Sequence, residues 1–329
     1  MTLSVTAFSS TEHSHKRFNP LTRSFVLVSP HRAKRPWLGQ EETLTENETP
    51  AYMPSCFLCP GNPRISGSTV NPQYTSAFVF GNDFPAVQDE QPPFVASGSM
   101  KRLANRLLKI EGVRGRCKVV CFSPNHALSM AEMSASEIRA VIEAWVSEYT
   151  ALGAEPHISH VQIFENKGAV MGCSNPHPHG QIWATEDVPE EPAKELDSLR
   201  AYREEHGGAC LLCDYATLEL QDRTRLVVEN ESFLCVVPFW AVWPFETMIL
   251  SKAHAASLLD LGDTQRDDLA DILSRLTVKY DNLFQVSFPY SMGIHQAPTD
   301  GSTDSPAHLH LHFYPPLLRS ATVKKFLVG

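Results

Sequence analysis

The stretch that decides the fold is Asn166-Lys167-Gly168-Ala169-Val170-Met171-Gly172-Cys173-Ser174-Asn175-Pro176-His177-Pro178-His179-Gly180-Gln181-Ile182-Trp183. Two histidines, His177 and His179, flank Pro178. Proline fixes its own φ and biases the residue before it toward extended backbone, so the segment should be extended, with both imidazoles on one face and able to serve one site. The glycines allow close backbone approach to an anion. The pattern predicts an imidazole set against a phosphate, and the alternative is two surface histidines in a Pro/Gly loop.

Length and composition favour a globular protein in the cytoplasm. The chain has 329 residues, enough for two domains of roughly 150 residues or one large domain. The net charge of −9 argues against nucleic acid as the main partner, but leaves room for an anionic substrate in a local basic pocket. The N-terminus lacks the basic start and apolar core of a signal peptide. The longest apolar tract, 233–245, is interrupted by prolines and is shorter than the roughly 20 residues of a membrane helix.

The spacing of the eight cysteines indicates metal chemistry. Cys56 and Cys59 form a C-x-x-C pair, which in a large cytosolic chain favours a metal over a disulfide. Two thiolates need two more ligands for tetrahedral Zn²⁺, and the downstream candidates are His126 and His177.

The alternating pattern predicts a turn feeding a strand within 19–30, and further strands at 76–80, 117–122 and 157–165. Three helices are expected, and the first begins with the capping-box pair Ser134 and Glu137 and stops at Gly153. The others cover 189–206 and 263–283, and residues 88–116 should form a mobile loop with a short helix. Glu195, near the start of the second helix, would ordinarily be a solvated charge.

A weak internal repeat runs from C-x-x-C through a strand and a helix to His-x-His, which suits two homologous domains. Its second copy begins at Cys210-Leu211-Leu212-Cys213 and closes on His308-Leu309-His310-Leu311-His312. Strand alternation places these three imidazoles on one face, where burial without a ligand would be costly. With His295 and one carboxylate they would make a site for a divalent metal such as iron or zinc.

Two further stretches suggest ligand binding. Residues 31–37, HRAKRPW, follow a strand with three fixed positive charges and are a candidate phosphate clamp, with a solvated basic loop as the alternative. Asn82 and Asp83 could hold a ribose or base, or simply form an Asx turn.

Taken together, these runs resemble galactose-1-phosphate uridylyltransferase, of the histidine-triad superfamily. The similar stretches are 29–37, 164–183, 243–247, 287–293 and 313–329. The resemblance implies an α+β fold with two related histidine-triad-like half-barrel domains of antiparallel strands flanked by helices. We place these domains at 1–187 and 188–329. It also implies a homodimer whose active sites lie at the subunit interface. From the net charge and the interrupted apolar tract we expect no association with nucleic acid or membranes.

The chemistry implied by the resemblance is a ping-pong transfer of UMP from UDP-glucose to galactose 1-phosphate, giving UDP-galactose and glucose 1-phosphate. His179 would be the nucleophile that becomes uridylylated, and Gln181 would donate to the phosphoryl oxygens. Ser174, Cys173 and Gly172 would line the phosphate site. The nucleotide sugar would be held by Arg32, Ala33, Lys34, Arg35, Ile65, Asn82, Asp83, Asn166, Lys325 and Phe326.

Two structural metals follow from the same resemblance. Cys56, Cys59, His126 and His177 match a zinc site that would brace the strand of His179. Glu195, His295, His310 and His312 match a second site for iron or a second zinc. Cys210 and Cys213 are not part of that pattern: they could join His254 and His308 in a repeat-equivalent zinc site, but buried free thiols are the favoured interpretation.

Two alternatives compete with the transferase. A histidine-triad hydrolase or phosphorylase would usually carry a third histidine in place of Gln181, and glutamine cannot act as an acid. The chain also stops at Gly329, where family members usually continue through one more segment that helps to contact the nucleotide sugar. That difference predicts either weaker binding of the nucleotide sugar or an inactive, shortened metal-binding homologue.

Overall fold

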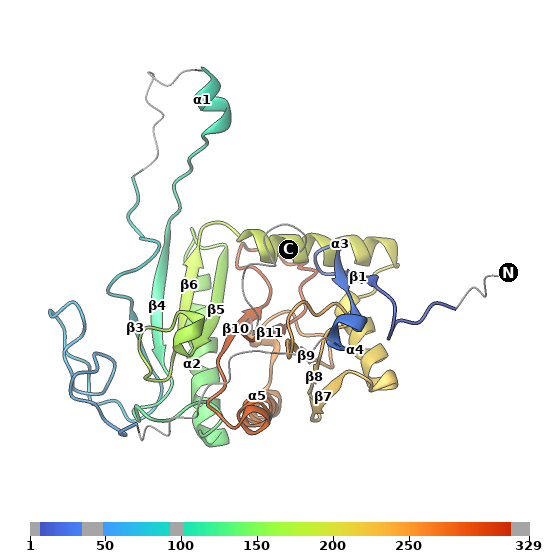
Figure 1. Cartoon of the computed structure of the whole chain (residues 1–329). Coiled ribbons are helices and arrows are strands. Elements are labelled where there is room, and N and C mark those ends of the chain that lie inside the picture. Colours follow the sequence, from blue (N-terminus) through green and yellow to red (C-terminus); the bar gives the residue numbers. More distant parts are fainter. Residues whose placement is uncertain (1–6, 35–48, 93–101, 317–329) are drawn as a thin grey trace.

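A single antiparallel sheet runs through both halves of the chain. The computed structural model describes residues 7–34, 49–92 and 102–316. Nine strands are ordered β3-β4-β6-β5-β10-β11-β9-β8-β7 (Figure 1). Their bounds are β3 Phe78–Gly81, β4 Gly115–Cys121, β5 His160–Lys167, β6 His179–Thr185, β7 Leu226–Glu229, β8 Phe233–Val236, β9 Thr247–Ser251, β10 Tyr290–His295 and β11 His310–Tyr314. The expected α+β class, with antiparallel strands flanked by helices, is confirmed.

The strand order has approximate twofold symmetry about the junction of β5 and β10, with β7 as an additional edge strand. On one side β5 is followed by β6, β4 and β3, and on the other β10 is followed by β11, β9 and β8. The first half contributes β3, β4, β5 and β6, and the second repeats the same order of strands around its own long helix. This arrangement agrees with the expected duplication. Because the sheet is continuous between the halves, the domain division at 187/188 stays a prediction.

Two long helices cover one face of the sheet. They are α2 (Ala135–Gly153) and α5 (Asp263–Phe284), and each occupies its predicted range. Ser134 and Glu137 form the predicted capping box at the start of α2. Apolar residues of both helices join the inward side chains of the strands in the main core, among them Trp145 and Leu273. Fully burying a side chain of this size stabilises the fold by about 1.5–3 kcal/mol.

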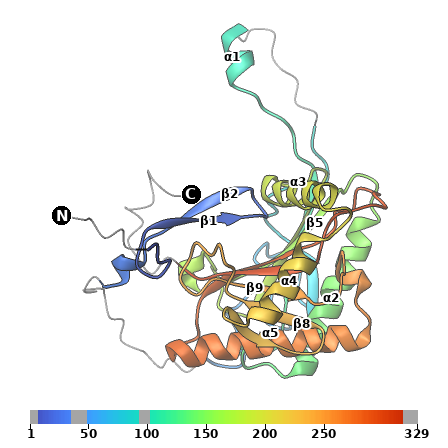
Figure 2. The same ribbon diagram turned by 90° about the vertical axis from the view of Figure 1, so that its right-hand side faces the viewer.

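The opposite face carries shorter elements. They are α3 (Glu190–Glu205), α4 (Leu211–Asp222) and the cysteine loop around residues 53–74. Figure 2 shows α3 and α5 on opposite sides of the sheet. The helix predicted at 189–206 is confirmed, whereas α4 was not predicted. A second core cluster joins Leu199 of α3 and Leu212 of α4 to Leu250 of β9.

A separate hairpin of β1 (His15–Asn19) and β2 (Ser24–Val28) leads into a 3-10 turn, η1 (Pro30–Lys34). Two further 3-10 turns are η2 (Ala169–Met171) and η3 (Leu258–Asp260). The hairpin lies on the second half of the chain, since Leu21 packs in the second core cluster and Arg17 donates to the carbonyl of Phe239.

Of the predicted loop over 88–116, the structure describes 88–92 and 102–116, and the short helix expected there is α1 (Arg102–Leu107), which lies far from the sheet (Figure 1). The last residues of the predicted loop already belong to β4, which begins at Gly115.

No helix in the described ranges is long and apolar enough to cross a membrane.

Candidate active site and metal centres

A small pocket lies on the sheet face opposite α2 and α5, where β5 and β6 run side by side. Strand alternation sends Ile163 and Ile182 into the core beneath the helices and leaves Asn166, His179 and Gln181 on the other face. The pocket is lined by Asn166, Gly172, Cys173, Ser174, His179, Gly180 and Gln181. All of these except Gly180 were predicted as site residues, so the structure brings the central part of the predicted site together.

His179 is held in one orientation by the backbone beside it. Its Nδ1 lies 2.7 Å from the carbonyl oxygen of His177. A carbonyl can only accept, so Nδ1 carries the proton and the lone pair is on Nε2. Burial lowers the pKa of His179, although the bond to His177 opposes the shift. The side chain is therefore a neutral imidazole near pH 7 with a nucleophilic nitrogen.

Two amides in the pocket are positioned by neighbouring side chains. The Gln181 Oε1 accepts a hydrogen bond of 3.2 Å from the Trp183 indole, so its remaining hydrogen-bonding group is a donor, the NH₂. Asn166 Oδ1 accepts a hydrogen bond of 2.6 Å from Ser291, which likewise leaves its NH₂ as a donor. Both amides can offer N–H groups to phosphoryl oxygens.

The loop between β5 and β6 supplies the rest of the wall. Gly168 has φ of 91° and approaches Pro289 so closely that a Cβ there would lie 2.7 Å from the proline Cβ. Gly172 has φ of 85°, in the left-handed region that favours glycine. Ser174 is exposed at the pocket, and the Cys173 thiol donates to the carbonyl of Asn175 at 3.1 Å. Burial raises the pKa of Cys173, so it is a neutral thiol near pH 7.

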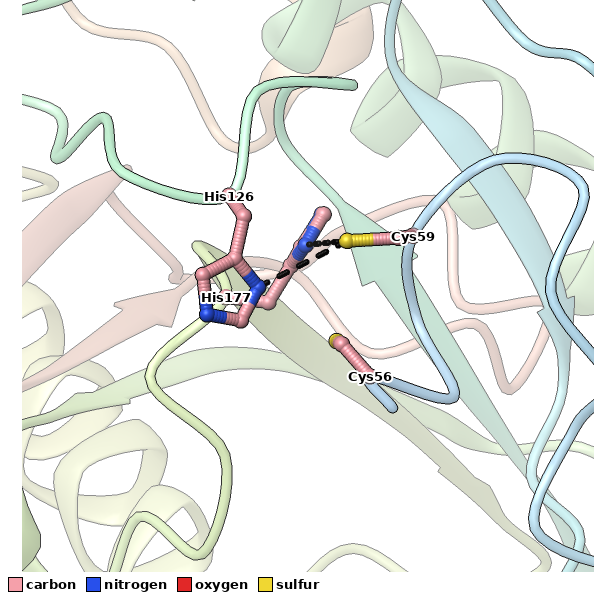
Figure 3. A group of neighbouring side chains, drawn as sticks. All are labelled: Cys56, Cys59, His126 and His177. Carbon is pink, nitrogen blue, oxygen red and sulfur yellow. Dashed lines mark hydrogen bonds between the residues drawn. The ribbon is translucent and has the colours of Figure 1, made fainter. Parts of the chain in front are cut away.

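The four residues predicted as zinc ligands converge next to this strand (Figure 3). One ligand atom from each of Cys56, Cys59, His126 and His177 lies within 4.8 Å of the others, and all four side chains are buried. Cys59 Sγ is 3.6 Å from His126 Nδ1 and 3.5 Å from His177 Nδ1. His177 Nε2 lies 2.9 Å from the carbonyl of Ser123, which leaves its Nδ1 lone pair facing the thiols.

The chemistry of this group fits a bound zinc ion. Burial raises the pKa of the Cys59 thiol to about 11, and burial lowers the pKa of His177 to about 4. The imidazole is therefore neutral, as a ligand must be, and a dication would displace the thiol protons on binding. The initial expectation that His177 and His179 serve one site is wrong. His177 faces the cysteines and His179 faces the pocket.

A second group gathers Glu195, His295, His310 and His312 on the same sheet face. Glu195 Oε2 lies 2.5 Å from His295 Nδ1 and 3.4 Å from His310 Nε2, and Oε1 lies 3.5 Å from His312 Nε2. Burial alone would raise the pKa of Glu195, but the charge and hydrogen bond of His295 hold it well below its usual value. Glu195 is thus a buried carboxylate and not the solvated charge that its position in a helix suggested.

The donor set of this second group also fits a cation. His310 Nδ1 lies 2.6 Å from the carbonyl of His308, so its lone pair is on Nε2 and faces the Glu195 carboxylate. Nε2 of both His310 and His312 is buried without a hydrogen-bond partner in the described chain. A bound cation would satisfy these atoms together. The triplet predicted on one strand face is divided, because His308 precedes β11 and turns to a different cluster.

The predicted nucleotide-sugar residues outside the pocket are dispersed. Arg32 is exposed in η1, and Lys34 pairs with Glu12 at 2.6 Å. Ala33 also lies in η1, whereas Arg35, Lys325 and Phe326 lie outside the described residues. In the described chain no hydrogen bond or pocket wall joins η1 to the pocket.

Near the end of β3, Ile65 is exposed and Asn82 caps a local turn by accepting from the backbone N–H of Phe84 at 2.9 Å. Asp83 pairs with Arg64, whose guanidinium also lies 4.1 Å from the centre of the Phe80 ring. Asn82 therefore forms an Asx turn, which was the alternative interpretation of this residue.

Sequence reasoning missed several residues that support the site. Asn175 donates to Cys56 Sγ at 3.5 Å and accepts from the backbone N–H of His177 at 3.0 Å. Tyr74 OH donates to the carbonyl of Leu58 and lies 3.1 Å from His177 Nε2. The Asn-Pro-His run was a usable signal for Asn175, because asparagine often bonds the backbone two residues ahead. Nothing local marks Tyr74 or Ser291.

Comparisons with known proteins agree with this geometry. Family models described as galactose-1-phosphate uridyl transferase, N-terminal and C-terminal domain, match residues 6–189 and 195–329. The galactose-1-phosphate uridylyltransferase of Kluyveromyces lactis is 54% identical, over 98% of this chain and 89% of its own.

Two solved structures are similar as well. A uridylyltransferase is 27% identical with a TM-score of 0.69, covering 92% of this chain and 86% of its own. An ADP-glucose phosphorylase from Arabidopsis thaliana is 25% identical with a TM-score of 0.72, covering 95% and 92%. The chain therefore belongs to the galactose-1-phosphate uridyl transferase family.

Proposed function

We propose that this protein is a UDP-glucose–hexose-1-phosphate uridylyltransferase of galactose metabolism, the Leloir pathway, as its named relatives are galactose-1-phosphate uridylyltransferases. His179 Nε2 attacks the α-phosphorus of UDP-glucose, and the bond from that phosphorus to glucose 1-phosphate breaks. The product is a covalent uridylyl-histidine. A phosphate oxygen of galactose 1-phosphate then attacks the same phosphorus, which releases UDP-galactose and frees His179.

The orientation of His179 carries this proposal. Its Nδ1–H donates to the His177 carbonyl, so Nε2 is the free nucleophile in the pocket. As Nε2 bonds to phosphorus the ring becomes cationic, and the same carbonyl stabilises the Nδ1–H that carries the charge. A covalent step divides one difficult transfer into two easier ones.

The remaining pocket residues suit a phosphoryl group. The Gln181 and Asn166 amides can donate to the non-bridging oxygens, and Ser174 adds a hydroxyl. Gly172 and Cys173 shape the wall and place backbone close to the phosphate. None of these groups is an acid that could readily protonate a leaving group or a base that could readily deprotonate water, which favours transfer over hydrolysis.

The metal groups support the site without entering the reaction. We assign zinc to the group of Cys56, because tetrahedral S₂N₂ coordination is typical of structural zinc. The carboxylate–imidazole group of Glu195 suits iron or a second zinc. When bound, these ions would fix strand ends and loops. The reduced thiols on which the first group depends are in keeping with a cytoplasmic protein.

A homodimer with shared active sites would explain the dispersed nucleotide residues. The hairpin that leads into the η1 segment of Arg32 packs on the second half of its own chain, and no described contact joins η1 to the pocket of that chain. The hairpin exposes Phe18, Phe25 and Leu27, an apolar surface of the kind found at interfaces. Asn82, Asp83 and Ile65 would then hold the nucleotide beside basic residues of a partner. Mixing inactive His179→Ala and Arg32→Ala proteins should restore part of the activity, and no recovery in a demonstrated mixed dimer would contradict shared sites.

The activity is tested by mass spectrometry of the full chain after exposure to UDP-glucose alone. We expect one UMP adduct per site on His179, which galactose 1-phosphate removes. His179→Ala should form none, while the exposed His206→Ala, a matched control outside the site, should behave like the wild type. Absence of the adduct in the metal-loaded wild type would overturn the proposal.

A phosphorylase is the competing function, supported by the structural similarity to the Arabidopsis ADP-glucose phosphorylase. The two functions differ in what removes the nucleotidyl group from His179. If inorganic phosphate discharges the adduct faster than galactose 1-phosphate, the phosphorylase replaces the transferase. Continuous release of UMP with neither acceptor would indicate a hydrolase.

A further inference from the structure

A third thiol–imidazole cluster lies in the second half of the chain, apart from both groups described above. It consists of Cys210, Cys213, His254 and His308, whose ligand atoms all lie within 4.8 Å of one another. Cys210 is the N-cap of α4 and Cys213 lies in its first turn, while His254 follows β9 and His308 precedes β11. Three separate segments therefore meet at one point.

The cluster has the spacing of a four-coordinate metal site. Cys210 Sγ is 3.4 Å from His308 Nδ1, and Cys213 Sγ is 3.5 Å from His308 Nδ1 and 3.7 Å from His254 Nδ1. Tetrahedral Zn²⁺ with Zn–S of about 2.3 Å and Zn–N of about 2.0–2.1 Å separates sulfur from nitrogen by roughly 3.5 Å. The observed distances agree with that value without any rearrangement.

Hydrogen bonds between thiols and imidazole explain the cluster less well. His308 Nε2 lies 2.9 Å from the carbonyl of Ser251, so this nitrogen carries the proton and Nδ1 holds a single lone pair. Both cysteine sulfurs approach that one lone pair. It cannot accept a good hydrogen bond from two thiols, whereas a cation at the centre would bind the nitrogen and both sulfurs at once.

The cluster repeats the construction of the first group. His177 Nε2 contacts the Ser123 carbonyl at 2.9 Å, as His308 Nε2 contacts that of Ser251. The paired imidazole rings are 5.3 Å apart in the first group and 5.4 Å apart in this one. In each group the backbone carbonyl of the buried histidine accepts a hydrogen bond from the Nδ1 of the histidine two residues later. The pairs are His177 with His179 and His308 with His310. The duplicated fold has kept the same arrangement in both halves.

We propose that Cys210, Cys213, His254 and His308 bind a zinc ion, a third metal centre of this chain. It ties the start of α4 to the loop after β9 and to the start of β11, and so supports the strand that carries His310 and His312. The site is more open than the first, since both cysteines are partly exposed and His254 is exposed. Cys210 and Cys213 are only half-buried, so they are not the buried thiols expected from the sequence, and the proposed zinc replaces the interpretation of them as free. The more open site should exchange metal faster with chelators.

Cobalt substitution of the full-length protein tests the site independently of catalysis. Co²⁺ bound to thiolates gives charge-transfer absorption, and the Glu195 group has no sulfur, so the signal reports only the two cysteine clusters. A Cys56→Ser/Cys59→Ser protein should keep about half of the wild-type signal, contributed by the proposed site. Cys210→Ser/Cys213→Ser should keep the other half, and the fourfold variant should have none. Absence of the signal in Cys56→Ser/Cys59→Ser, with secondary structure intact by circular dichroism, would overturn the proposal.

Zinc content provides a second measurement. Cys210→Ser/Cys213→Ser should contain about one zinc fewer per chain than the wild type after expression in zinc-supplemented medium. Cys117→Ser, which alters a cysteine outside all clusters, should match the wild type. Equal zinc in the double variant and the wild type would also overturn the proposal. Failure of the UMP-adduct test would leave both measurements valid.

Discussion

His177 and His179 are joined by a hydrogen bond of 2.7 Å from the Nδ1 of His179 to the carbonyl oxygen of His177. The His177 imidazole points the other way, with its Nδ1 3.5 Å from Cys59 Sγ. His177 thus directs its side chain to the candidate metal group and its backbone carbonyl to His179, the proposed nucleophile. Because Pro178 and this bond link the two histidines, we expect order in the cysteine group to affect the orientation of His179.

The first prediction concerns that coupling. Cys59→Ser should weaken zinc binding and loosen His177, and so slow formation of the UMP adduct by about 10–100-fold, the usual effect of losing a residue that orients another. The free energy of unfolding should fall by at least about 2 kcal/mol. Single-turnover adduct formation and urea denaturation measure the two effects. Cys117→Ser is the control, and a Cys59→Ser protein with normal zinc content and normal rate would contradict the coupling.

The second prediction concerns Gln181. Gln181→His places an imidazole that can act as an acid or base beside the uridylyl group, so transfer to galactose 1-phosphate should slow and loss of UMP to water should rise. A change of about tenfold or more in the ratio of hydrolysis to transfer is expected. Release of UMP with and without galactose 1-phosphate measures it. If both rates are unchanged, Gln181 does not contact the phosphoryl group.

The third prediction is a pH profile. Burial lowers the pKa of His179 below its ordinary value of 6.5 in the folded protein. The neutral form of His179 is the proposed nucleophile, so the rate of adduct formation should be constant above pH 6.5 and fall only as the pH drops through the lowered pKa. Rapid-quench measurement of the adduct across pH 5–8 tests this. An acid limb with its midpoint above 6.5 would mean that a different group controls the step.

The fourth prediction concerns Glu165, which lies buried beneath the pocket and accepts a hydrogen bond of 2.9 Å from Tyr290 OH. Burial raises its pKa from 4.5 to about 7. A raised folded-state pKa gives stability that is present in full below pH 4.5 and lost as the pH rises through 7.

Glu165→Gln keeps the acceptor for Tyr290 and removes the titration. The free energy of unfolding of the variant minus that of the wild type should therefore be larger at pH 8 than at pH 5, by up to about 3 kcal/mol. Urea denaturation at the two pH values measures the difference. The same relative stability at both values would show that Glu165 is already ionised in the fold at pH 5.

The sequence by itself determined the features that arise from local periodicity and short motifs. The capping box at Ser134 and the spacing of apolar residues fixed α2, because both act within a few turns of backbone. The Pro178 segment and strand alternation after it placed His179 and Gln181 on one face. The candidate ligands Cys56, Cys59, His126 and His177 were also named from the sequence, because a C-x-x-C pair in a large cytosolic chain favours a metal over a disulfide, and the structure brings the four together.

Tertiary structure decided how distant residues combine. Glu195 became a buried carboxylate only because α3 crosses the sheet where β10 and β11 present their histidines. His308 turned to Cys210 and Cys213, away from His310, because it precedes the pairing of β11 with β10 and so does not follow the alternation of the strand. Alternation governs only residues inside a paired strand. What lies beyond its end depends on which loop the strand order brings near, and a local pattern contains no such information.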